Sequence, residues 1–290
     1  MYKRQDLERS IKVLNNLGLV EIFTDTKEAG IQGYDGKRYE LPEPGELLAR
    51  INEKREIFEE KLHTFENPRF LLVPLAISIP KLLETYAGEL MKRKDSLVFS
   101  DGTKTFEYPR RPLPNWNEYD SGHSENDDTP LYSSSEYQNA DTDMKYLDEH
   151  TSAYKDEEGK ENGKSKAEKV LELGGYSIFL MEDVPDVPKT GTGKEGRKTP
   201  PPGTSSNNIL TLLQQANKDK TPLSNERGLY LEEYLTYALT KLIESNTVID
   251  DIQGEGKFSW IEGNFLSGGV PSACWNRDDS QAEMLSLIHI

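Results

Sequence analysis

The segment Gly191-Thr-Gly-Lys194-Glu-Gly196 is the part of this 290-residue chain that most resembles a phosphate-binding loop. A working loop has the spacing GxxxxGK[ST], follows a strand, and leads directly into a helix whose first amides hold the phosphate. Here the prolines 200–202 follow shortly after Gly196 and prevent such a helix. The sequence therefore favours a surface loop over a nucleotide site.

Histidine and acidic residues, which serve as metal ligands and as general acids or bases, are scattered along the chain. His63, His123 and His150 lie in unrelated segments, and none has a second histidine four residues away. Acidic side chains occur close together at Asp127 and Asp128, at Asp141 and Asp143, and at Asp250 and Asp251. None of these places has the glycine-centred loop ending in glutamate that an EF-hand requires. We therefore expect no metal site.

Cys274 is the single cysteine, which rules out an internal disulfide and a zinc site built from several cysteines. A nucleophilic thiolate needs an activating neighbour, and no histidine or lysine lies near Cys274 in sequence. We therefore expect no catalytic residue and no cofactor, and a non-enzymatic role is favoured over an enzymatic one.

The segment Gly268–Ala282 combines short polar residues with a tryptophan and an arginine. Short polar side chains on a rigid backbone form an adaptable binding surface. A buried tryptophan between them anchors the backbone. The short polar residues here are Ser272, Cys274, Asn276, Asp278, Asp279 and Ser280, and they surround Trp275 and Arg277.

Gly256–Trp260 and Gly268–Ala282 together resemble the variable region of target proteins of diversity-generating retroelements. In that family the chain ends in a C-type-lectin fold related to the formylglycine-generating-enzyme fold. Adenine-directed mutagenesis rewrites codons such as AAC and AAT, which enriches variable sites in Asn, Asp, Ser and Tyr. This chain has no RLPTEAEWE-like signature of the formylglycine-enzyme relatives, and no Gly-Val-Arg-type strand follows Ala282.

The resemblance implies a binding protein whose variable side chains point outward and contact a ligand, most simply another protein or a surface ligand. It assigns ligand binding to Ser272, Cys274, Asn276, Asp278, Asp279 and Ser280. It assigns the framework between them to Trp260, Trp275, Arg277 and Gln281.

Two other classes of function stay open on the sequence alone. The first is an enzyme, such as a hydrolase or a nucleotide-dependent enzyme that uses carboxylates and the Gly191–Gly196 loop. The second is a structural scaffold that assembles through amphipathic helices.

Apolar periodicity and capping residues predict the elements that position these residues. Helices are expected at Leu7–Leu17, Pro44 to about Leu62, Pro80 to about Lys94 with Met91 inward, Lys166–Leu173, Ile209–Ala216 and Leu229–Glu244. Strands are expected at Leu19–Phe23, Lys37–Leu41, Arg69–Ile77, Tyr176–Met181 and Thr247–Ile252, with a hairpin at Val98–Tyr108. Short β or irregular pieces are expected at Lys257–Trp260 and Phe265–Trp275.

These elements predict an α+β fold, with helices packed on small mixed sheets and long irregular loops. We divide the chain into an N-terminal α+β region (6–108), a polar, linker-like region with partly anchored aromatic residues (109–165) and a C-terminal α+β region (166–284). The resemblance implies that the C-terminal region is an incomplete C-type-lectin-like fold.

The composition is acidic, with a formal net charge of -16. This balance disfavours non-specific nucleic-acid binding, which depends on Lys and Arg against phosphate. No apolar run approaches the roughly 20 residues that span a bilayer. We therefore expect a soluble protein, located in the cytoplasm unless a signal precedes the chain.

Both ends have the codon pattern of a sequencing adapter. Met1–Gln5 can be read as GTG TAT AAG AGA CAG, and Leu285–Ile290 as CTG TCT CTT ATA CAC ATC. The second string contains the reverse complement of the first. We therefore expect residues 1–5 and 285–290 to derive from an adapter and the natural stretch to be a bacterial, metagenomic fragment of a longer protein.

Overall fold

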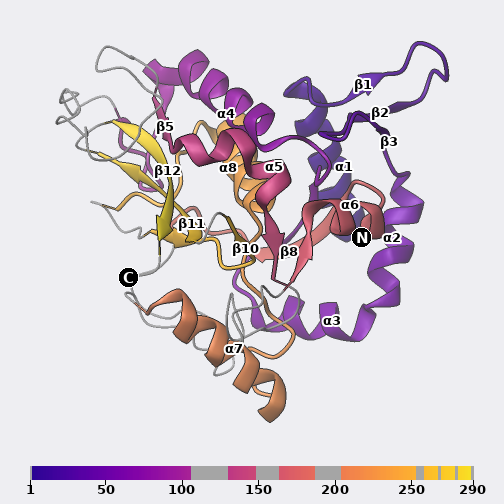
Figure 1. Cartoon of the computed structure of the whole chain (residues 1–290), viewed down its shortest axis with the longest axis vertical. Helices are drawn as coiled ribbons and strands as arrows, with labels where there is room; N and C mark the ends of the chain where they lie inside the picture. The colour runs from indigo at the N-terminus through magenta and orange to yellow at the C-terminus, as the bar shows by residue number, and fades with distance from the viewer. Residues whose placement is uncertain are drawn as a thin grey trace.

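The chain has an α+β fold, as the sequence predicts (Figure 1). A computed structural model describes residues 2–105, 130–147, 163–186, 204–252, 258–266, 269–277 and 280–288. Its helices are α1 (Tyr2–Asn16), α2 (Pro44–Glu53), α3 (Arg55–Thr64), α4 (Ile79–Arg93), η1 (Lys94–Ser96), η3 (Ser135–Asn139), α5 (Ala140–Asp143), α6 (Lys166–Leu173), α7 (Ser206–Asp219) and α8 (Leu231–Ser245).

The strands form four small sheets, with the orders β1-β2-β3, β10-β6-β7, β5-β12-β11-β9 and β4-β8. Their bounds are β1 (Glu21–Ile22), β2 (Ala29–Gln32), β3 (Arg38–Glu40), β4 (Pro68–Val73), β5 (Leu131–Ser133), β6 (Lys145–Tyr146), β7 (Lys164–Ser165), β8 (Ser177–Glu182), β9 (Ser259–Trp260), β10 (Asn264–Phe265), β11 (Gly269–Asn276) and β12 (Gln281–Ile288).

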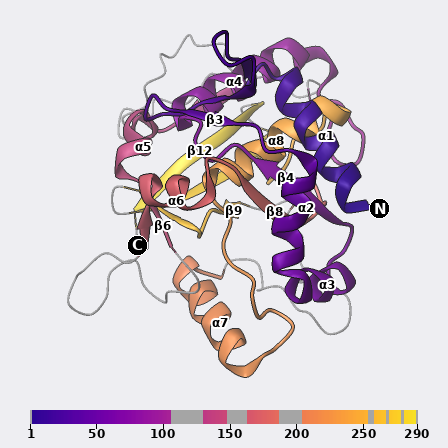
Figure 2. The same ribbon diagram turned by 90° about the vertical axis from the view of Figure 1, so that its right-hand side faces the viewer.

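Helix α8 forms the centre of the molecule, while α7 lies at the opposite end from α4 (Figures 1 and 2). Every side chain from Leu231 to Thr240 is buried, including Glu232 and Glu233. Such all-round burial is typical of a helix in the interior of a domain. Helices α1 and α4 and strand β4 pack around α8.

One hydrophobic core includes residues from all three sequence regions. Strand β4 pairs with β8 in antiparallel register from Pro68–Glu182 to Val73–Ser177. Strand β5 pairs with β12 in parallel register. The boundaries at 108 and 165 therefore do not separate independently packed cores. Tyr137 and Tyr146, within the predicted linker-like region, are both buried in this core.

The structure contains the predicted helices that correspond to α1, α4, α6, α7 and α8. The prediction of one long helix from Pro44 to Leu62 is wrong, because this segment forms two helices, α2 and α3. It breaks at Lys54, whose φ and ψ of -111° and 29° lie outside the helical region. The break lets α2 bury Leu47 and Ile51 in the core. It also turns α3 so that Lys61 reaches Glu226, with its ammonium 3.0 Å from the carboxylate.

Three other local predictions are corrected. Met91 is 40% exposed rather than inward. The expected strand Arg69–Ile77 ends at Val73, because Pro74 has no N–H to donate to a ladder. The segment Thr247–Ile252 forms only single bridges, and Asp250 interrupts it with a φ of 57°.

The hairpin predicted at Val98–Tyr108 is reduced to its turn. Phe99 donates its N–H to the Thr103 carbonyl at 2.8 Å, and Gly102 supplies the positive φ of 84°. Val98 and Lys104 form one isolated bridge. Residues 106–108 of the predicted hairpin lie outside the described part of the chain.

A buried ion cluster joins α5, α6, β6 and α8. The Lys166 ammonium lies 2.5 Å from the Asp141 carboxylate and 3.0 Å from the Glu232 carboxylate. It also donates to the Ile77 carbonyl at 2.8 Å, and Tyr146 donates its hydroxyl to Glu232 at 2.5 Å. Burial by itself lowers the pKa of Lys166, because it favours the neutral amine. The attraction of the Glu232 and Asp141 carboxylates outweighs this effect, so the pKa of Lys166 is raised. The cluster holds the ends of these elements in fixed positions.

Candidate functional site

Strands β11 and β12 form the longest antiparallel pair among the described residues, and they carry most of the predicted site. Their register runs through eight pairs, from Gly269–Ile288 to Asn276–Gln281. Strand β9 pairs with the other edge of β11, and β5 pairs with the other edge of β12. The two strands lie side by side in Figure 1. Neighbours on both edges restrain this backbone.

The predicted variable and framework positions separate onto two faces of β11. Side chains alternate along a strand, so Ser272, Cys274 and Asn276 share one face and Trp275 lies on the other. Trp275 is buried in the main core together with Met284 of β12. The large aromatic side chain therefore anchors β11 from the face opposite the predicted ligand-binding positions.

The expectation that the variable side chains point outward is wrong for three residues. Ser272 and Cys274 are 0% and 2% exposed, and Ser280 is buried as well. The physical reason is that every residue of β11 from Gly269 to Trp275 is buried, whichever way its side chain points. Both faces of this central strand are therefore covered, and only its last residue, Asn276, is half-exposed.

Asn276 belongs to a small polar cluster at the end of the strand pair where β11 leads into β12. Its amide nitrogen donates to one Glu283 carboxylate oxygen at 2.8 Å. The Cys274 thiol lies 3.7 Å from the other oxygen. Burial and then the Glu283 carboxylate raise the pKa of the Cys274 thiol, so the sulfur stays protonated at neutral pH. The cluster can exchange hydrogen bonds with a ligand but offers no thiolate nucleophile.

Arg277 follows β11 and is held in place by an acidic partner. Its guanidinium Nε lies 2.8 and 2.7 Å from the two carboxylate oxygens of Asp251, which is buried. The guanidinium also stacks 4.0 Å from the centre of the Phe99 ring. The N–H of Asp251 bonds to the Asp186 carboxylate at 3.0 Å, which fixes the acidic partner in turn. Arg277 therefore has one well-defined position.

Arg277 and Ser280 are the described residues between the two strands. Ser280 has a φ of 52° and donates its N–H to the Arg277 carbonyl at 3.2 Å. The predicted ligand-binding residues Asp278 and Asp279 lie outside the described residues. Of the remaining framework residues, Gln281 is buried beside the turn, and Trp260 of β9 packs against a small satellite core that includes Val270.

The other predicted chemical groups do not gather around this site. The Gly191–Gly196 loop, His123, His150 and Asp127-Asp128 lie outside the described residues. His63 lies on α3. Asp141 belongs to the buried cluster with Lys166. In the described ranges, no group of three or more His, Cys, Asp or Glu side chains has the arrangement of a metal site.

Sequence reasoning missed Glu283 and the pairing of Asp251 with Arg277. Glu283 lies directly opposite Cys274 in the β11–β12 register. Once β12 is known to be a strand, its period of two places Glu283 on the same face as Asn276. No comparable signal pointed to Asp251. It lies 26 residues before Arg277 in the sequence, and only the tertiary fold brings the two side chains together.

Comparison of the chain with protein-family models, with curated proteins and with solved structures found no match in any of the three. Within the part of the chain that the structure describes, no helix is both long enough and apolar enough to cross a membrane.

Proposed function

We propose that this chain is a non-enzymatic binding protein that recognises its ligand with the connected end of the β11–β12 strand pair, where β11 ends at Asn276 and β12 begins at Gln281. One observation carries the proposal. Asn276 shares a strand face with the predicted variable positions and is half-exposed, while Trp275 is buried on the opposite face. The side chain at position 276 can therefore change without disturbing the core.

The surroundings of Asn276 support recognition of a polar ligand surface. Asn276 and Glu283 are both partly buried residues, and the amide nitrogen of Asn276 lies 2.8 Å from the Glu283 carboxylate. Two such groups accept and donate hydrogen bonds with little rearrangement, because the paired strands restrain their backbones. This suits a protein or another surface ligand that presents complementary polar groups.

The resemblance to target proteins of diversity-generating retroelements supports the same proposal. It predicts a rigid framework carrying a few exchangeable polar side chains. The burial of Ser272, Cys274 and Ser280 narrows the proposed contact surface to Asn276 and its neighbours at the turn. Asp278 and Asp279, which the sequence also predicts to contact the ligand, lie outside the described residues.

Sequencing of the surrounding locus tests the proposal most directly. We expect a near-copy of the coding segment for Gly268–Ala282 that differs only at adenines, next to a reverse-transcriptase gene. A complete gene that lacks both would refute the diversified surface.

A stability comparison tests the separation of the two faces. Asn276→Tyr is a change that adenine mutagenesis can produce, and we expect it to cost about 0.5–1.5 kcal/mol, the net value of the hydrogen bond to Glu283 that it removes. Trp275→Ala is the matched control in the same strand and should cost about 3–5 kcal/mol, since it empties a buried aromatic site. Equal losses of unfolding free energy for the two variants would contradict the proposal that the side chain at position 276 can change without disturbing the core.

A further inference from the structure

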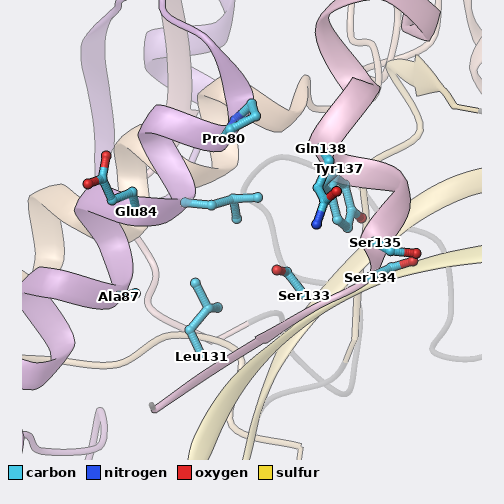
Figure 3. A pocket seen from close by; sticks show the side chains of 10 residues that line it. Pro80, Glu84, Ala87, Leu131, Ser133, Ser134, Ser135, Tyr137 and Gln138 are labelled. Atoms are coloured by element: carbon cyan, nitrogen blue, oxygen red, sulfur yellow. The ribbon is translucent and has the colours of Figure 1, made fainter. Parts of the chain in front are cut away.

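A separate pocket lies on the α4 side of the sheet that contains β12 (Figure 3). Its cavity volume is about 250 Å³. One wall is α4, and the other is the segment from β5 through η3. The residues that line it are Pro80, Leu83, Glu84, Ala87, Leu131, Ser133, Ser134, Ser135, Tyr137 and Gln138.

The pocket has an apolar base and two inward polar groups. Leu83 and Leu131 are buried core residues from the two walls. Figure 3 shows the Ser133 hydroxyl and the Gln138 amide nitrogen turned toward the space between α4 and η3. The hydroxyls of Ser134 and Ser135 point away from that space. An apolar base with a few directed polar groups is the usual composition of a small-molecule site.

The wall that carries these groups is fixed from behind. Tyr137 is 1% exposed and donates its hydroxyl to the Leu285 carbonyl of β12 at 2.9 Å. Leu131 and Ser133 pair in register with Ala282 and Met284 of the same strand. The backbone that carries the Ser133 side chain is therefore held by the sheet.

Charge excludes ionic ligands from this pocket. Among the described residues, no Lys, Arg or His lines the pocket, so an anion would lose its hydration without gaining a partner from them. The one charged residue in the described lining is Glu84, whose side chain is 72% exposed and whose carboxylate lies 3.0 Å from the Lys81 ammonium. In Figure 3 this carboxylate points away from the cavity. The site therefore offers a cation no buried counter-charge.

We propose that this pocket binds a small uncharged organic molecule, made of one ring or a short branched chain with a single amide, carbonyl or hydroxyl group. The volume is just below the range of about 300–1,000 Å³ that is usual for drug-sized ligands, which limits the occupant to a fragment of that size. The apolar part lies against Leu83 and Leu131, and the polar group bonds to Ser133 and Gln138. This site is independent of the proposed recognition surface at Asn276.

Benzamide is the probe that tests the proposal, because it combines one ring with one neutral amide. Saturation-transfer NMR on the full chain should give a Kd of about 1 mM. Benzoate, which has the same ring and a negative charge, should bind at least about tenfold more weakly. No benzamide signal at about 10 mM, or equal binding of benzoate, would overturn the proposal.

Three variants locate the probe. Ser133→Ala should weaken benzamide binding roughly fivefold by removing one hydrogen bond. Ser135→Ala is the matched control from the same segment and should leave Kd unchanged. Ala87→Phe fills the cavity from α4 and should abolish binding, with its thermal unfolding measured to confirm that it folds. Unchanged binding in both Ser133→Ala and folded Ala87→Phe would place the probe elsewhere and refute the assignment.

Discussion

The Arg277–Asp251 pair yields the sharpest test of how the recognition end is held. Arg277→Met keeps the length of the side chain but leaves the Asp251 carboxylate buried without its cation. The Asp251 side chain is 3% exposed, and its N–H is already engaged by Asp186. It therefore cannot move to water without breaking a second contact.

The expected loss follows from this geometry. Removing one partner of a buried ion pair costs about 3–5 kcal/mol. The lost stacking on Phe99 is part of that figure and by itself is worth about 0.5–2 kcal/mol. Arg277→Lys keeps the charge but loses the two-pronged contact and the stacking, so we expect an intermediate loss of about 1–3 kcal/mol.

Urea unfolding followed by tryptophan fluorescence measures these losses. A double-mutant cycle with Asp251→Asn isolates the coupling between the two side chains, which should exceed about 1 kcal/mol. Arg55→Met is the control, because Arg55 pairs with Glu59 on the exposed face of α3 and should matter by less than about 0.5 kcal/mol. A loss below about 1 kcal/mol for Arg277→Met would refute the reasoning.

Three further predictions concern buried groups. Lys166→Met should lower the free energy of unfolding in urea by about 3–5 kcal/mol, because it leaves Glu232 and Asp141 buried without a cation. Lys164→Met is the control at an exposed pair and should change it little. Equal urea midpoints for the two variants would contradict this prediction. The pKa of Lys166 is raised above its ordinary value of 10.5, so its contribution to stability is complete below that pH and falls as pH rises through the higher folded pKa. Unfolding measured from about pH 9 to about pH 12 should show the wild type losing more stability than Lys166→Met, and parallel profiles would argue against it. Alkylation of Cys274 by iodoacetamide at pH 8 should be at least about 100-fold slower in the native than in the denatured chain. The reason is that burial keeps the reagent away from the thiol and raises its pKa. Similar rates in the two states would show that the thiol is accessible in the native chain.

Local sequence signals predicted most of the helices and much of the turn structure. Ser165 and Glu168 form a complete capping box at the start of α6, and Gly174 ends that helix with a φ of 65°. These signals work because a helix satisfies its hydrogen bonds within a few residues, so its limits are encoded nearby. The break at Lys54 has no such signal, since it depends on where α2 and α3 find their packing partners.

The candidate site divides in the same way. The order of Ser272, Cys274, Trp275 and Asn276 along the chain is enough to place Trp275 on one strand face and the three small polar residues on the other. Which of these side chains reaches solvent is not encoded in that order. It depends on β9 and β12 at the edges of β11 and on the layers that cover both faces.

By itself, the sequence determined the α+β class and the helix limits set by caps, because each arises from interactions between near neighbours. Only the tertiary structure decided that Ser272 and Cys274 are buried, that Arg277 rests on Asp251, and that Lys166 neutralises Glu232 inside the core. These outcomes depend on contacts between distant segments, and burial is a property of the assembled core rather than of any one segment.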